Sequence, residues 1–382
     1  MKKQFLFFTI FTLAIFAGTF NSFGQNLTGN IASCPVPTVV DPTCIASDAF
    51  HPIPGTPYMY EITVPNIAAG SGEYTWYVTQ DPNFVAAGTL NNATADGVPG
   101  NFIAGIGAGG GTYNNDAGGG TNEIEITWNS FTHDPASPVF VVIQVRGTDA
   151  ADCPVNNLKV YVIEPVNAFT LDIAAVTDAA AGSDITYGAT AVSCFPDVVS
   201  AEWDATNNEV DYDYGTSYIF FMVNAANYST SWRPSFQVAG LDGAIQEAVL
   251  DWALSSTPTA WNNVPYTGAA PDYNGVYYDP AGEVPVQDAS GTVGAAGECI
   301  LVRLTVTHNH YEGIADQAIT LAVDGETHLA AATPLKDVHH VDCSDDGYTN
   351  DVATHTLESR PEIQDATAPA GDDFLPIGPD NN

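Results

Sequence analysis

The chain has 382 residues and a formal net charge of −37, with eight Lys and Arg against 45 Asp and Glu. Nucleic acids and anionic membranes are bound through clusters of basic side chains, so this composition argues against both as partners. The charge is typical of a solubilising surface, while a saline habitat and loosely held Ca²⁺ are alternative explanations. The length leaves room for two or three domains, each able to bury a core.

Residues 1–24 have the pattern of a secretory signal peptide. Lys2 and Lys3 precede an apolar run over residues 5–16, and small residues at 22–24 suit cleavage. The run is too short for a membrane span and no second one follows, so we expect a mature chain without one. The predicted location is secreted or cell-surface, with the periplasm as the alternative.

Six cysteines follow the signal, an even number that predicts disulfides in an exported chain. They are Cys34, Cys44, Cys153, Cys194, Cys299 and Cys343. Fifteen connectivities are open if all six pair. We interpret Cys34 with Cys44 as a local staple and Cys194 with Cys343 as a tie between the ends of a second domain.

The first domain is predicted over residues 25–165, with a Pro- and Cys-rich opening segment up to residue 57. Alternating apolar residues predict strands at 58–64, 73–79, 123–128, 139–146 and 158–163. In the second of these, Tyr74, Trp76 and Val78 share one face, which makes the Trp a natural core residue. The Gly-rich residues 80–122 lack the Lys and Ser/Thr of a phosphate loop, so we expect a flexible connection.

A second, larger domain is predicted over residues 166–364, followed by an acidic, disordered tail over 365–382. The continuous apolar run at 218–223 predicts a strand covered on both faces. Residues 246–254 fit either a short helix or a strand, and 255–297 read as another long connection. Further strands are predicted at 169–173, 185–187, 192–194, 300–307, 319–323, 338–341 and 353–357. The whole pattern predicts an all-β chain of tandem immunoglobulin-like β-sandwiches.

One stretch near the C-terminus has the oxygen ligands of a calcium loop. Asp342, Ser344, Asp346 and Asp351 offer oxygens at short spacing, but Ala353 stands where an EF-hand needs Glu. An EF-hand is therefore excluded. A looser Ca²⁺ site on a β scaffold and a plain polar turn remain alternatives, and no other cofactor is predicted.

A set of aromatic residues lies in the predicted connection rather than in a core pattern. Its members are Trp261, Tyr266, Tyr273, Tyr277 and Tyr278. Aromatic rings in loops often hold sugars or partner proteins. Packing over one end of the sandwich is the competing interpretation.

Catalytic motifs are missing. The sequence contains neither Gly-x-Ser-x-Gly nor His-Glu-x-x-His, and 45 acidic residues make any one acid pair uninformative. Histidines such as His308 and His355 are interpreted as exposed loop residues rather than metal ligands. No catalytic residue is predicted.

Residues 58–165 resemble the PKD-like and immunoglobulin-like modules of secreted Bacteroidota surface proteins. The resemblance rests on the Trp-bearing strands 74–78 and 124–128 and on Cys153-Pro154 ahead of the strand at 158–162. It implies a β-sandwich used for spacing, adhesion or assembly at the cell surface, without catalysis. A C-terminal sorting domain is not recognisable, and the second domain is larger than one such module.

The sequence therefore favours an exported, non-enzymatic structural or adhesion protein of the cell surface or extracellular space. Its expected partners are other surface or extracellular proteins, further copies of itself, or glycans. One alternative is a Ca²⁺-assisted carbohydrate-binding accessory protein. The other is a hydrolase with an unrecognised acid pair in the second domain.

Overall fold

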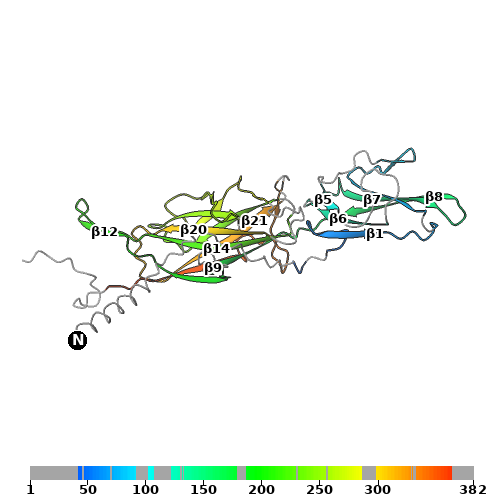
Figure 1. The fold of residues 1–382 in the computed structure, drawn as a ribbon. Coiled ribbons are helices and arrows are strands. Elements are labelled where there is room, and N and C mark those ends of the chain that lie inside the picture. Colours follow the sequence, from blue (N-terminus) through cyan, green and yellow to red (C-terminus); the bar gives the residue numbers. More distant parts are fainter. Residues whose placement is uncertain are drawn as a thin grey trace, which may run out of the picture.

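The computed structural model places the regular elements of the chain as β-strands in two sandwiches (Figure 1). It describes residues 42–44, 47–68, 71–91, 102–106, 122–129, 131, 133–178, 186–228, 231–254, 257–285, 298–327, 329 and 333–363. The predicted signal peptide, Cys34 and the predicted tail lie outside these residues. In the described part, no helix is long and apolar enough to span a membrane. The prediction of an all-β chain of tandem β-sandwiches is confirmed.

The first sandwich consists of two antiparallel three-stranded sheets. One has the order β1 (Pro57–Glu61), β6 (Glu123–Trp128), β5 (Ile103–Ile106), and the other β2 (Glu73–Thr79), β7 (Val139–Thr148), β8 (Pro154–Ile163). The short hairpin of β3 (Val85–Ala86) and β4 (Thr89–Leu90) lies outside both. Apolar residues of both sheets form one core, as packing two half-apolar sheets face to face requires.

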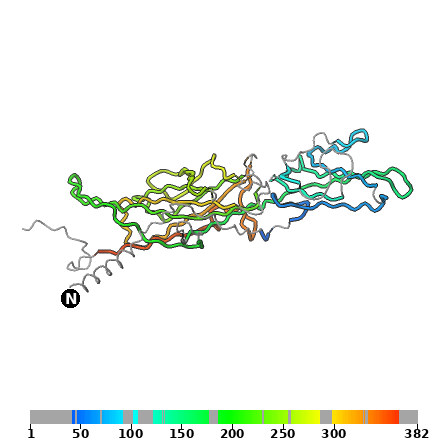
Figure 2. Tube along the Cα trace, viewed as in Figure 1, coloured from blue at the N-terminus to red at the C-terminus, as the bar shows by residue number. Residues whose placement is uncertain are grey.

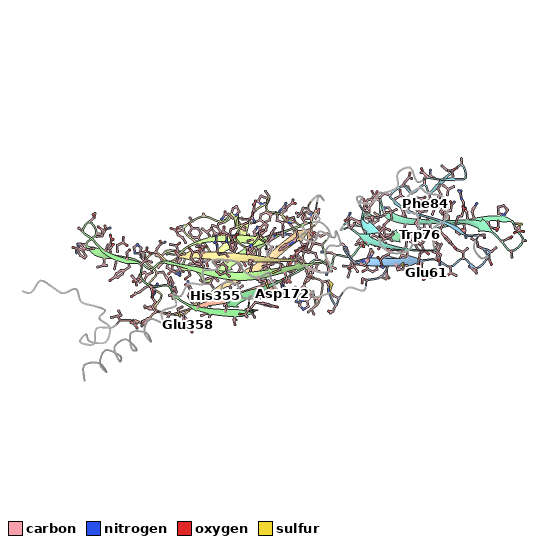
Figure 3. The ribbon with its side chains drawn as sticks, viewed as in Figure 1. Glu61, Trp76, Phe84, Asp172, His355 and Glu358 are labelled. Carbon is pink, nitrogen blue, oxygen red and sulfur yellow. A yellow bond between two sulfur atoms is a disulfide. The ribbon has the colours of Figure 1, made fainter. Side chains whose placement is uncertain are left out.

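Trp76 lies at the centre of this core and is fully buried, as its strand pattern predicts (Figure 3). Trp128 lies beside it in the other sheet and donates its indole N–H to Tyr60 Oη at 2.9 Å. The opposite face of β2 is not solvated, contrary to the half-buried pattern. Tyr77 is buried and donates to Phe84 O at 3.2 Å, because the segment after β2 folds back over this face.

The second sandwich is larger. Its six-stranded sheet has the order β10 (Thr186–Gly188), β9 (Thr170–Asp178), β14 (Thr216–Ala226), β20 (Glu298–Thr307), β16 (Glu247–Leu254), β17 (Asn262–Val264). Its seven-stranded sheet runs β11 (Thr190–Cys194), β23 (Val352–Glu358), β21 (Gln317–Thr327), β15 (Ser231–Ala239), β18 (Gly275–Tyr278), with β19 (Val284–Pro285) and β22 (Leu335–Lys336) paired beside it. β12 (Ser200–Asp204) and β13 (Glu209–Asp213) form a separate hairpin.

β14 is covered on both faces, as its continuous apolar run predicts. Ile219, Phe221 and Val223 point into the core between the sheets. Phe220 and Met222 belong to a smaller cluster on the outer face, against which Trp261 packs. The strand therefore has almost no exposed side chain in its centre.

Several local predictions are decided by pairing. Residues 247–254 form strand β16 rather than a helix, because they pair along their length with β20. The two predicted connections contain several short strands, among them β5 and β18. No strand forms at 338–341, because Val338 makes one isolated bridge and donates its N–H to Phe169 O instead.

The two sandwiches lie end to end, and residues 164–169 connect β8 of the first to β9 of the second (Figure 2). Residues of the opening segment run beside this linker. Glu164 N–H donates to Phe50 O at 2.8 Å, and Val166 N–H donates to Pro52 O at 3.1 Å. The opening segment thus forms part of the junction.

A disulfide between Cys44 and Cys343 crosses the junction, with Cα atoms 5.9 Å apart. Thr43 N–H donates to His340 O at 2.8 Å beside it. Both predicted pairings are wrong, since Cys44 pairs with Cys343 and Cys194 is free and exposed. Sequence proximity favoured Cys34 for Cys44, but the fold brings the opening segment against the β22–β23 loop, 299 residues away.

Candidate functional site

The most unusual side-chain group of the second sandwich is a cluster of carboxylates at its junction end. Asp337 follows β22, and Asp346 and Asp351 lie in the loop that leads to β23. One carboxylate oxygen from each lies within 4.8 Å of the others. We call these three residues the junction acid cluster. Asp172, near the start of β9, is close enough to contribute to the raised pKa of Asp351, and Figure 3 labels its position.

Pairing of the strands explains how these residues meet. β22 pairs antiparallel with the end of β21, so Asp337 returns to the level of Asp324 and Gly325. Asp337 N–H donates to Gly325 O at 3.1 Å, and Gly325 N–H donates to Asp337 Oδ1 at 3.1 Å. Asp351 lies at the start of β23, where its carbonyl accepts from Val323 N–H at 3.0 Å. Both acids are therefore fixed against β21.

Repulsion among the carboxylates makes this cluster unfavourable unless a proton or a cation neutralises part of its charge. Two carboxylate charges no more than 4.8 Å apart repel by about 3 kcal/mol or more at an effective dielectric constant of about 20. Burial raises the pKa of the Asp337 carboxyl, and the nearby Asp324 raises it further. Burial likewise raises the pKa of Asp351, with Asp346 adding to the effect. The site therefore favours a proton or a cation among the three.

One amine lies near this cluster but does not enter it. Lys336 Nζ is 3.7 Å from Asp324 Oδ2 and 3.7 Å from Glu326 Oε2. Its side chain is 44% exposed, so it neutralises the rim rather than the buried centre. Asp337 is fully buried, and its Oδ2 has no hydrogen-bond partner in the described part of the chain.

The structure brings together half of the sequence-predicted Ca²⁺ ligands. Asp346 and Asp351 belong to the cluster. Asp342 instead closes a turn, accepting from Ser344 Oγ at 2.7 Å and Ser344 N–H at 3.1 Å. These hydrogen bonds lower the pKa of Asp342, whose side chain is 63% exposed. Asp337 was missed because no local spacing marks it; only the β21–β22 pairing brings it into place.

The predicted aromatic set divides in the structure. Tyr266 packs against Tyr273 and Tyr277 with ring centroids 5.7 and 4.9 Å apart. Tyr277 is buried in the main core, and the two others pack against it. These rings are tilted by 34° and 42° rather than coplanar. Their contacts are those of a packing cluster over one edge of the sandwich.

The other two aromatic residues contact ion pairs. The Arg303 guanidinium lies 4.3 Å from the Trp261 ring and donates to Asp251 Oδ2 at 2.7 Å. Tyr278 Oη donates to Glu326 Oε1 at 2.9 Å, the same oxygen that accepts from Arg233. Neither ring belongs to the Tyr266 cluster, so the five residues do not form one binding surface.

The outer end of the second sandwich carries an exposed apolar surface around the β12–β13 hairpin. Its large side chains are between 41% and 67% exposed: Val198, Val199, Trp203, Val210, Tyr212 and Ile314. We call this set the outer-end face. A hollow of about 780 Å³ lies among several of them, bordered by Arg360 and His310. Arg360 Nη2 donates to Tyr214 O at 3.0 Å and fixes the floor.

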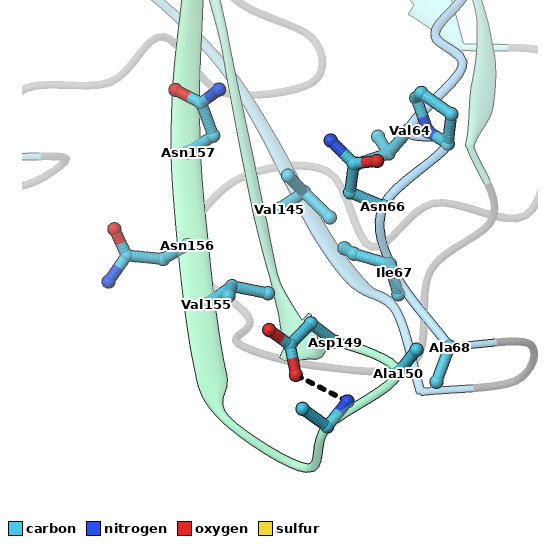
Figure 4. Close-up of a pocket in the computed structure, with 12 residues that line it drawn as sticks. Val64, Asn66, Ile67, Ala68, Val145, Asp149, Ala150, Val155, Asn156 and Asn157 are labelled. Atoms are coloured by element: carbon cyan, nitrogen blue, oxygen red, sulfur yellow. Dashed lines mark hydrogen bonds between the residues drawn. The ribbon is translucent and has the colours of Figure 1, made fainter.

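A second hollow of about 670 Å³ lies at the far tip of the first sandwich (Figure 4). Val64 and Ile67 form one wall, and the β7–β8 turn with Asn156 forms the other. The Asp149 carboxylate is occupied as the acceptor of Ala151 N–H at 2.8 Å. The hollow therefore offers amide and apolar groups but no acid pair.

His308 and His355 are both fully buried, contrary to the expectation that they lie in exposed loops. Gln246 Nε2 donates to His308 Nδ1 at 2.9 Å, so the ring proton resides on Nε2 and is donated to Ser217 Oγ at 2.8 Å. Burial lowers the pKa of His308 to about 4 and that of His355 to about 4. Neither is a member of the acid cluster.

The chain is similar to known proteins only at the level of solved structures, and only with low scores. No protein-family model and no curated protein matches the chain. Among solved structures, it is similar to the C-terminal domain of the Streptococcus pyogenes antigen I/II-family protein AspA, at 11% identity and a TM-score of 0.20. That match covers 62% of this chain and 58% of the other. Another is the collagen adhesin of S. aureus, at 9% identity and a TM-score of 0.19, covering 79% and 86% of the two chains. TM-scores this low decide neither fold nor function.

Proposed function

We propose that this protein is an exported, non-enzymatic component of the cell surface or extracellular space that acts in adhesion or assembly. The tandem sandwiches form a spacer, and the outer-end face forms the contact surface. The disulfide across the junction supports an oxidising compartment, because such bonds persist outside the cytosol. The sequence resemblance to surface modules of Bacteroidota points in the same direction.

The outer-end face is the observation that carries this proposal. Folded monomers rarely expose a contiguous apolar patch unless it binds something. Trp203 is 59% exposed on a hairpin whose two strands pair only with each other in the described part of the chain. Trp and Tyr dominate binding hot spots, and free strand edges accept an added strand. Val210 lies opposite Trp203 on the hairpin, and Val198 and Ile314 line the same hollow as Tyr212. This apolar setting fits a protein partner better than a glycan.

A non-enzymatic role is supported by the acids of the hollow beside this face. Glu209 and Glu312 border it, but both are exposed. A hydrolytic acid pair needs one carboxyl kept protonated by burial. We therefore place binding rather than hydrolysis at this end of the molecule.

Attachment of cells that export the full chain to protein-coated surfaces tests the proposal. We expect Trp203→Ser combined with Val210→Ser to reduce attachment by about tenfold or more, as loss of a hot spot does. Tyr187→Ser is the matched control, since Tyr187 is 46% exposed but lies on β10. Attachment no greater than that of cells without the chain, or equal for both variants, would refute it. Turnover of glycosides or peptides that Glu209→Gln abolishes would establish the hydrolase instead.

A further inference from the structure

The junction acid cluster contains a buried carboxylate oxygen that nothing in the described structure satisfies. Asp337 is fully buried; its Oδ1 accepts from Gly325 N–H, while its Oδ2 has no partner. Buried polar atoms are almost always paired. An unpartnered oxygen on a buried carboxylate that lies within 4.8 Å of two others therefore points to a cation as the missing partner. Lys336 does not fill this role, because its amine contacts Asp324 and Glu326.

The three oxygens lie close enough together to share one Ca²⁺ ion. Ligand oxygens lie 2.3–2.6 Å from Ca²⁺, so two ligands on opposite sides of the ion are about 4.8 Å apart. The three carboxylates each offer an oxygen within 4.8 Å of the others. Mg²⁺ draws its ligands closer, to about 2.0–2.1 Å, and keeps several waters. Zn²⁺ prefers His and Cys, neither of which belongs to this cluster.

We propose that Asp337, Asp346 and Asp351 bind one Ca²⁺ ion at the junction end of the second sandwich. Three carboxylates supply three negative charges against two positive ones, a balance common in Ca²⁺ sites. Asn350 Nδ2 donates to Asp346 Oδ1 and helps to hold that carboxylate. Asp324 lies next to Asp337 and adds negative charge at the rim.

The position of the site gives the ion a mechanical role. The loop from Asp337 to Asp351 carries Cys343, which is bonded to Cys44, and His340, which accepts from Thr43. Asn167 of the linker donates to Lys336 O at 2.7 Å, directly before Asp337. The ion joins the two ends of this loop. Bound Ca²⁺ therefore orders the loop and stiffens the connection between the sandwiches. The adhesion proposal rests on the opposite end of the molecule, so either inference can fail without the other.

Calorimetric titration of the chelator-treated, disulfide-bonded full chain with CaCl₂ tests the site. We expect one Ca²⁺ per chain, with a dissociation constant between about 10⁻⁶ and 10⁻³ M. Asp337→Asn should weaken binding at least about tenfold, because it removes one ligand charge. Asp342→Asn is the matched control and should bind as the wild type does. MgCl₂ and ZnCl₂ alone should bind more weakly than CaCl₂.

Absence of binding to the wild type at about 5 mM Ca²⁺, above the range of extracellular modules, would overturn the proposal. Equal affinity in Asp337→Asn would do the same, as would tighter binding of Zn²⁺. Hydrogen exchange provides a readout that does not depend on any variant. Ca²⁺ should slow exchange in residues 338–351 by about tenfold or more, while β2 and β7 remain unchanged. No slowing would refute the ordering role.

Discussion

Two groups of buried polar residues lie at opposite ends of the second sandwich, and they are built in opposite ways. At the outer end, His308 contacts Ser217 and Gln246, and Gln246 exchanges hydrogen bonds with Gln317. This network is neutral, and both His308 nitrogens have partners. At the junction end, three carboxylates lie within 4.8 Å of one another, and one buried oxygen of Asp337 has no hydrogen-bond partner among the described residues.

The difference shows how a structural polar network is distinguished from a ligand site. A buried network whose donors and acceptors balance stabilises the fold by itself. A cluster of like charges is unfavourable by itself and becomes favourable when something of opposite charge binds. We therefore expect opposite responses to substitution at the two ends.

The largest expected effect is at the outer end. Gln246→Ala should lower the free energy of unfolding by about 3 kcal/mol, because it orphans His308 Nδ1 and the Gln317 amide. Gln237→Ala, on an exposed position of β15, is the control and should stay within about 0.5 kcal/mol. Denaturant titration measures both. A loss below about 1 kcal/mol would mean that the network contributes little.

The second-largest effect is expected at low pH, where protonation of His308 should lower the free energy of unfolding. The pKa of His308 is about 4 in the folded chain and 6.5 when the ring is fully solvated, as in the unfolded chain. As the pH falls, the unfolded chain therefore takes up the proton before the folded chain does. The contribution of this residue is complete above pH 6.5 and falls as the pH drops toward 4. Between pH 7 and pH 5 the loss is about 2 kcal/mol. Comparing the pH slope of the wild type with that of His308→Gln isolates it, and equal slopes would contradict the buried neutral ring.

At the junction end, Asp337→Asn should not destabilise the chain in the presence of a chelator. It removes repulsion of about 3 kcal/mol per carboxylate pair at full ionisation, so the unfolding free energy should stay equal or rise by about 1 kcal/mol. In Ca²⁺ the order should reverse, because the wild type binds the ion more tightly and gains more stability from it. Thermal unfolding with and without Ca²⁺ shows this crossing. Strong destabilisation in chelator would make the cluster structural.

The smallest effect is expected for Asp342→Asn, whose carboxylate closes an exposed turn. Loss of that acceptor charge should leave the melting temperature close to that of the wild type, with or without Ca²⁺. A Ca²⁺-dependent change in its melting temperature would place Asp342 in the metal site and restore the ligand set expected from sequence.

Sequence predicted the parts of this fold that depend on local alternation. The burial of Trp76 in β2 and of the apolar run in β14 could be predicted from the sequence, because successive side chains along a strand point to opposite faces. β16 was ambiguous, since its residues fit both periods and only pairing with β20 decides between them. The cover over Tyr77 was not predictable, because it comes from a later loop rather than from the strand itself.

The candidate site was predicted only in part, because strand pairing as well as local spacing brings its members together. Asp346 and Asp351 belong to one short stretch and were found by their spacing. Asp337 belongs to the cluster through the β21–β22 pairing, which no short spacing encodes. The Cys44–Cys343 disulfide likewise joins segments 299 residues apart. Non-local contacts of this kind cannot be predicted without the fold, whereas the Asp-rich stretch could be recognised from the sequence alone.

A crystal structure of the full chain grown with CaCl₂ would show whether the junction acid cluster binds Ca²⁺. We expect an anomalous scattering peak surrounded by oxygens of Asp337, Asp346 and Asp351 at about 2.3–2.6 Å. Carboxylates paired with one another at hydrogen-bond distance, with no peak between them, would show that protons rather than Ca²⁺ neutralise the cluster.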